Sequence, residues 1–143
     1  MFGKRKKAVN GAARLRGLAF FEGFSDADLD RVAQLADDVE VEAGELLIDQ
    51  GRVGQECFVI ESGQAEVFVG EEHLVTVGPG SMVGEMALID RRPRTATVVA
   101  TTSMALLAFD TKAFQKLLSE MPKAEERVHA LLAARIKANL KVD

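Results

Sequence analysis

The 143-residue sequence contains no Trp and no Tyr, so its eight Phe are the only aromatic residues. Phe, Leu, Val and Ile must therefore fill the interior. With 48% hydrophobic and 28% charged residues, the composition is that of one globular domain with an ordinary core. The chain is too short for two domains of usual size.

Cysteine is nearly absent, and long apolar runs are missing. The single Cys57 lies in the apolar run 57–60, which predicts a buried strand, and it has no partner in the chain for a disulfide. This usage favours a reducing compartment, and the apolar setting argues against a reactive thiol. No stretch approaches the about 20 apolar residues of a membrane span, and the N-terminus lacks the apolar segment of a signal peptide. We expect a soluble, cytoplasmic protein.

Charge is distributed unevenly along the chain. The net charge is −4, yet the first sixteen residues hold six basic and no acidic side chains, which leaves twelve basic against twenty-two acidic ones in the rest. The excess of acidic residues after residue 16 argues against a broad nucleic-acid surface, and we expect no nucleic acid as a partner. The basic run 4–7 could contact nucleic acid or anionic lipid, but such runs are usually solvated tails. We predict a flexible basic arm over residues 1–13 and one domain over 14–143.

The middle of the sequence has the spacing of short strands and turns. Segments rich in Val, Ile, Leu, Phe and Thr recur between glycines from Val39 to Phe109, with no helical segment long enough for a crossover. We predict strands over 39–41, 46–49, 57–61, 65–69, 73–77, 95–100 and 104–109. Helices are predicted over 26–36, over 111–120 and from residue 122 onward. The fold class is therefore mainly β, an antiparallel jelly-roll-like β-roll with an N-terminal helical segment and C-terminal helices.

Histidine is scarce, which weighs against catalytic chemistry. His73 and His129 lie far apart, and neither has a Cys or His at metal spacing. Jelly-roll metalloenzymes of the cupin type need several His around a metal, and no Ser-His-Asp or Cys-His arrangement is visible. We expect no metal and no enzymatic activity.

The segment 80–98 interrupts the run of strands with features that suit an anion. A short helix that begins at Gly84 leaves the backbone N–H groups of Glu85, Met86 and Ala87 pointing outward, and Gly84 has no Cβ to obstruct a phosphate. Arg94, at the start of the next strand, can pair with the single negative charge of a cyclic phosphodiester.

Glu85 cannot usefully face that anion, so its carboxylate is suited to accept a hydrogen bond from a ribose 2′-OH. Ordinary interpretations also exist for both charged residues. Arg94 could be a surface charge in an Arg-rich run, and Glu85 could simply be a favourable acid in the first turn of a helix.

These residues resemble a known motif. The sequence Val83-Gly84-Glu85-Met86-Ala87-Leu88, followed by Pro93-Arg94-Thr95-Ala96, is similar to the phosphate-binding cassette of the cyclic nucleotide-binding domain family. The family includes catabolite activator proteins, protein kinase regulatory subunits and gated channels. Upstream positions match the family's spacing as well: Gly44, Leu47, Gly51, Gly54, Phe58 and Gly63. The similarity covers about residues 15 to 140.

The resemblance implies a ligand and the residues that contact it. The ligand is a cyclic nucleotide, with cAMP favoured and cGMP possible. Thr95 would touch the phosphate or guanine, or else be a simple β-former. Leu74, Val75 and Val83 could line the base or belong to the core, and Asn139 could hydrogen-bond adenine or be a solvated residue near a helix end. The full set of ligand-binding residues is Gly84, Glu85, Met86, Ala87, Arg94, Thr95, Ala96, Val83, Leu74 and Asn139.

The implied function is that of a non-enzymatic receptor domain that signals by movement of its C-terminal helix. The signal would pass to a second copy in a homodimer or to an unidentified effector protein. The alternative is a degenerate member that binds no nucleotide and serves as a docking domain. The sequence departs from the family at Val83, where an aromatic is usual. It also ends at Asp143, where the activator proteins continue into a helix-turn-helix, so we do not expect this chain to act as a DNA-binding activator.

Overall fold

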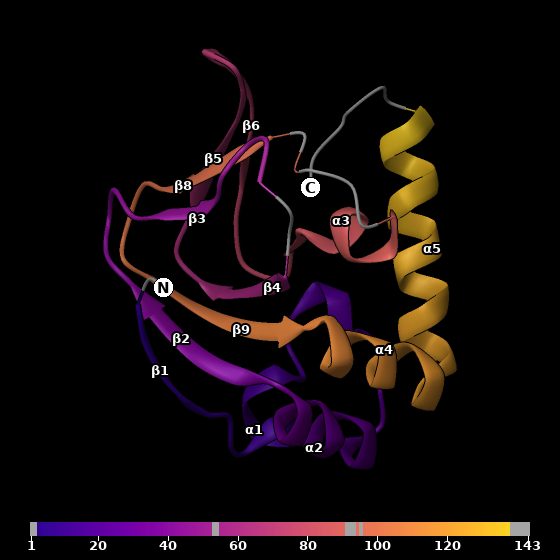
Figure 1. Ribbon diagram of the computed structural model, residues 1–143. Coiled ribbons are helices and arrows are strands. Elements are labelled where there is room, and N and C mark those ends of the chain that lie inside the picture. Colours follow the sequence, from indigo (N-terminus) through magenta and orange to yellow (C-terminus); the bar gives the residue numbers. More distant parts are fainter. Residues whose placement is uncertain (1–2, 53–54, 91–93, 95, 138–143) are drawn as a thin grey trace.

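The computed structural model describes residues 3–52, 55–90, 94 and 96–137. Their elements form a β-roll with helices packed along one side (Figure 1). The strands are β1 (Lys4–Lys7), β2 (Asp37–Val41), β3 (Leu46–Ile48), β4 (Glu56–Ser62), β5 (Ala65–Val69), β6 (Glu72–Val77), β7 (Met82–Val83), β8 (Thr97–Ala100) and β9 (Met104–Asp110). The helices are α1 (Gly11–Leu15), the 3-10 turn η1 (Ala19–Phe21), α2 (Asp26–Leu35), α3 (Glu85–Asp90), α4 (Thr111–Glu120) and α5 (Pro122–Lys137).

Two antiparallel sheets make up the roll. One has the strand order β1-β2-β9-β4-β7 and the other β3-β8-β5-β6. Every strand pairing in the described residues is antiparallel, which confirms the predicted fold class. Each predicted strand is present with small shifts at its ends, and β1 and the short β7 are additional.

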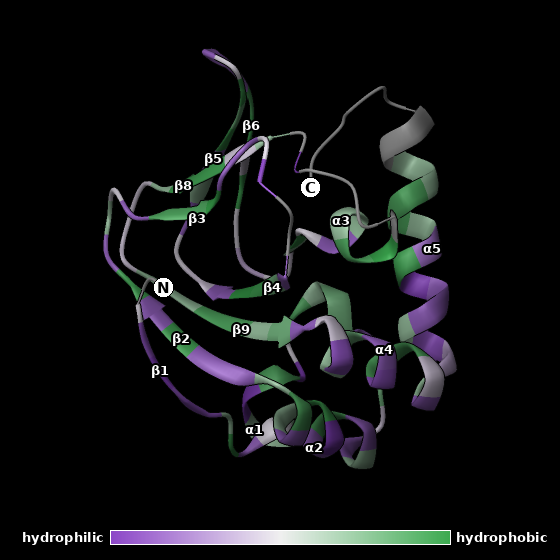
Figure 2. Cartoon of the chain, viewed as in Figure 1, coloured by the Kyte–Doolittle hydropathy of each residue, from purple (hydrophilic) through white to green (hydrophobic). Residues whose placement is uncertain are grey.

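Strand β4 is buried on both faces, because the two sides of its sheet meet different parts of the core. Cys57 and Val59 pack against the helices, whereas Phe58 and Ile60 point into the roll. Successive residues of a strand point to opposite faces, so a strand covered on both sides needs an unbroken apolar run. Strand β9 is likewise hydrophobic over most of its length (Figure 2). Burial raises the pKa of the Cys57 thiol well above its usual range, so the thiol stays protonated.

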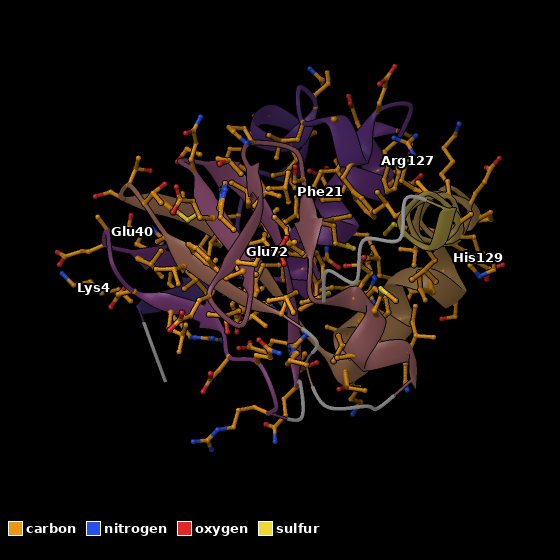
Figure 3. All side chains as sticks on the ribbon, turned by 90° about the horizontal axis from the view of Figure 1, so that it is seen from above. Lys4, Phe21, Glu40, Glu72, Arg127 and His129 are labelled. Atoms are coloured by element: carbon orange, nitrogen blue, oxygen red, sulfur yellow. The ribbon has the colours of Figure 1, made fainter. Side chains whose placement is uncertain are left out.

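Polar contacts within the helical layer cap α2 and join α5 to η1. Ser25 caps α2 by accepting a hydrogen bond from the N–H of Asp28. Arg127 of α5 donates hydrogen bonds of 2.8 Å to the carbonyls of Ala19 and Glu22. Figure 3 shows α5 end-on, with Arg127 and His129 along it. None of the described helices is long and apolar enough to cross a membrane.

The N-terminal residues differ from the prediction of a flexible basic arm. Lys4–Lys7 form the edge strand β1, which pairs with β2. The register places Lys4 opposite Glu40 and Lys6 opposite Asp38, so that basic and acidic side chains face each other across the strand pair. Cross-strand pairs of opposite charge stabilise a sheet. Such pairs leave no apolar pattern in the sequence, which is why no strand is predicted there.

Candidate functional site

The segment that leaves the roll after β7 is held at its start by β4. Val83 pairs with Phe58 in the β4–β7 ladder, and the N–H of Gly80 donates to the carbonyl of Ile60 at 2.7 Å. Helix α3 follows directly and lies between the roll and α5 (Figure 1). The sheet therefore fixes the point at which α3 begins.

Gly84 stands at the junction of β7 and α3, in a conformation that requires glycine. Its φ is +92°, a region that residues with a side chain rarely adopt. A Cβ on Gly84 would also lie only 2.9 Å from Nη1 of Arg94 and 3.1 Å from the carbonyl oxygen of Glu56. The glycine thus permits both the turn and the close approach of the Arg94 guanidinium.

Arg94 is held in place through its backbone and its side chain. Its N–H donates to the carbonyl of Arg52 at 2.6 Å, and its carbonyl accepts from Gly51 at 2.8 Å. Its guanidinium donates to the carbonyl of Gly84 at 2.7 Å and also to the carbonyl of Glu56. The side chain is therefore fixed next to the start of α3 rather than free to sample other rotamers.

Glu85 and Arg94 are the two buried charged residues of the part of the chain that the structure describes. Glu85 is fully buried, and Arg94 is 6% exposed. Burying a charge is costly unless opposite charges or hydrogen bonds compensate it, so two such residues beside one glycine are a strong indication of a functional site. The ordinary interpretation of Arg94 as a surface charge is wrong.

The remaining predicted residues lie around this centre or outside the described residues. Ala87 and Ala96 are buried, and Met86 is half-buried on α3. Val83 is fully buried in the core inside the roll. Leu74 is half-buried on β6, where its neighbours Val75 and Val77 pack against that same core. Thr95 and Asn139 lie outside the described residues.

Sequence reasoning missed Glu56, which contacts the site through two different groups. Its backbone carbonyl accepts from Arg94, and its carboxylate accepts two hydrogen bonds from Arg5. A carbonyl exists on every residue, so no residue type could have identified this contact. Within the described ranges no group of three or more His, Cys, Asp and Glu could hold a metal ion.

Comparison with known proteins places these features in a family. A sequence model of the cyclic nucleotide-binding domain matches residues 38–121. The type II regulatory subunit of cAMP-dependent protein kinase from Drosophila melanogaster is 32% identical over 104 residues, which make up 73% of this chain and 28% of that subunit. This chain therefore spans little more than a quarter of that relative.

Two solved structures share the fold. The catabolite activator protein of Thermus thermophilus superposes with a TM-score of 0.77 at 27% identity, covering 85% of this chain and 59% of the other. A cAMP-binding acyltransferase from Mycobacterium smegmatis gives a TM-score of 0.72 at 30% identity, covering 89% of this chain and 41% of the other.

The geometry at Gly84 predicts an unusual cost for one added methyl group. Gly44 has the same φ of +92°, but a Cβ there would meet no atom within 4 Å. We expect Gly44→Ala to lower the free energy of unfolding by about 1–2 kcal/mol through the backbone alone. Gly84→Ala should cost a further ~1 kcal/mol or more, because its Cβ collides with Arg94 and Glu56. Urea denaturation followed by circular dichroism measures both variants, and equal losses would contradict the close approach at Gly84.

Proposed function

This chain belongs to the cyclic nucleotide-binding domain family, and we propose that it is a receptor domain that binds cAMP, or in its place cGMP, beside Gly84. The observation that carries the proposal is the pair of buried opposite charges at that glycine: Glu85 follows it in the chain, and the Arg94 guanidinium lies against it. In this proposal the chain binds the nucleotide and does not transform it.

Arg94 is the counter-charge of the cyclic phosphate in this proposal. A cyclic phosphodiester carries one negative charge, and a guanidinium stays protonated at every physiological pH. The two carbonyls of Gly84 and Glu56 hold the guanidinium in one position, which reduces the conformational entropy that is lost on binding. Hydrogen bonds between charged partners in a site this buried are shorter and stronger than those at the surface.

Glu85 and the start of α3 contact the rest of the ribose phosphate. Glu85 begins α3 directly after Gly84, so the first N–H groups of that helix lie next to the Arg94 guanidinium. Because a carboxylate would repel the phosphate, its favourable partner is a hydroxyl donor, and the ribose 2′-OH is the group that distinguishes the ligand from a deoxyribose.

Helix α5 is the output element of the proposed receptor, and a second copy of this chain is the proposed partner. Val128 of α5 is fully buried in the helical core, whereas Leu131 and Leu132 are only half-buried against it. Arg127 anchors the first half of the helix to η1. A ligand that contacts one position of α5 better than another shifts the population toward that position.

Titration calorimetry with cAMP and cGMP tests the proposed site. We expect binding by the wild-type chain, and at one hundred times the dissociation constant a stabilisation of about 2.7 kcal/mol that raises the melting temperature. Arg94→Ala should weaken binding by roughly 2–5 kcal/mol. Arg52→Ala is the matched control, because its side chain is 81% exposed, and it should bind like the wild type. The absence of binding to either nucleotide would favour a docking domain.

The same titration with 2′-deoxy-cAMP separates the role of Glu85. The wild type should prefer the ribose, and Glu85→Ala should lose that preference while keeping part of its affinity for the phosphate. An unchanged preference in Glu85→Ala would remove Glu85 from the ribose site.

Light scattering tests whether α5 passes the signal to a second copy. Leu132→Asp should yield a monomer under conditions in which the nucleotide-bound wild type is a dimer. Leu118→Asp on α4 is the control, because Leu118 is also half-buried against the core that the helices share. This variant should keep the oligomeric state of the wild type. A wild type that is monomeric with and without nucleotide would rule out the homodimer and leave another effector.

A further inference from the structure

Arg5 and Glu56 form an ion pair that joins the N-terminal strand β1 to the start of β4. Two hydrogen bonds of 2.6 Å connect Nη1 and Nη2 of Arg5 to the two carboxylate oxygens of Glu56. Their side chains are 17% and 24% exposed, whereas those of the surface pair Arg16–Asp26 are 63% and 69% exposed. Because both side chains have little access to water, solvent screens the attraction between Arg5 and Glu56 far less than that of an ordinary surface pair.

Glu56 also contacts Arg94, so one residue lies between two arginines. Its carboxylate binds Arg5 while its carbonyl accepts from the Arg94 guanidinium. The charges of the Glu56 carboxylate and the Arg94 guanidinium both act on the thiol of the next residue, Cys57. Burial is the main effect that raises the pKa of that thiol, the Arg94 cation lowers it, and the Glu56 carboxylate raises it further. The negative charge of Glu56 therefore acts in the same surroundings as the positive charge of Arg94.

We propose that Arg5 is a positioning residue for the nucleotide: by neutralising Glu56, it keeps the Arg94 guanidinium available to an anionic ligand. The inference rests on the proposed function of the Gly84 site. It makes β1, which lies outside the matched residues 38–121, a part of the ligand-binding apparatus.

The sign of the effect follows from the charges. Without Arg5, the Glu56 carboxylate stays partly buried beside the Arg94 site and lacks its bidentate partner. Its negative charge then offsets the positive charge of the Arg94 guanidinium and repels the incoming phosphate, and both effects weaken binding. Removing the carboxylate as well abolishes both effects. Electrostatic support by Arg5 therefore predicts that a second substitution, at Glu56, rescues the first.

A purely structural clamp predicts the opposite pattern. If the pair served only to fasten β1 to β4, Arg5→Met, Glu56→Gln and the double variant would all break the same contact and weaken binding alike. The double variant thus distinguishes an effect of charge from a loss of packing.

The experiment measures cAMP affinity by calorimetry for the wild type, Arg5→Met, Glu56→Gln and the double variant Arg5→Met/Glu56→Gln. We expect a loss on the order of tenfold for Arg5→Met, by the Coulomb energy of one uncovered charge at partial exposure. Glu56→Gln should bind as tightly as the wild type or more tightly, and the double variant should recover most of the loss.

Arg14→Met is the matched control. Arg14 also lies in the N-terminal segment and makes 2.7 Å hydrogen bonds to two carboxylates, Asp38 and Glu61, and neither of these residues contacts Arg94 in the described structure. It should lower the melting temperature of the ligand-free chain without changing cAMP affinity. Melting temperatures of all variants without ligand show that each is folded at the temperature of the titration.

Two results would overturn the inference while leaving the proposed function intact. The first is a wild type that binds cAMP together with an Arg5→Met variant of equal affinity. The second is a double variant as weak as Arg5→Met. A wild type that binds neither cAMP nor cGMP would overturn the proposed function and this inference with it.

Discussion

The hydrogen bonds from the Arg94 guanidinium to the carbonyls of Gly84 and Glu56 join the candidate site to the roll. They connect three parts of the chain: the start of β4, the residue before α3 and a residue three positions before β8. A cation buried to this degree needs compensating groups, and the carbonyls supply them within the protein. The position of Gly84 follows from the same contact, because any side chain there would occupy the space of the guanidinium.

The sequence was sufficient to predict the fold where local pattern and burial agree. The glycine-bounded apolar runs correspond to strands because each is covered on one or both faces, as Cys57 and Phe58 illustrate from opposite sides of β4. The prediction was wrong for β1, because its stability does not come from apolar periodicity. Its lysines face the acidic residues of β2, and that match becomes visible only when residues 4–7 are compared with residues 37–40.

The two charged side chains of the candidate site were predictable from the sequence, whereas the groups that hold them in place were not. Glu85 and Arg94 were identified because their charges suit a ribose phosphate, and the structure buries both beside Gly84. Glu56 could not be identified, since it contributes a carbonyl that any residue could offer, and its carboxylate pairs with Arg5, fifty-one positions earlier in the sequence. Long-range polar contacts of this kind depend on the closed curvature of the roll, which no local pattern encodes.

The measurement that tests the central claim most directly is a heteronuclear NMR titration of the ¹⁵N-labelled chain with cAMP. If the phosphate binds at Gly84, the backbone amides of Gly84, Glu85 and Met86 and the side-chain Nε–H of Arg94 will show the largest shifts. Signals from the exposed β5–β6 turn at Gly70 should stay in place. Saturable binding with these four signals unmoved, and with the shifts gathered on another surface, would contradict the account.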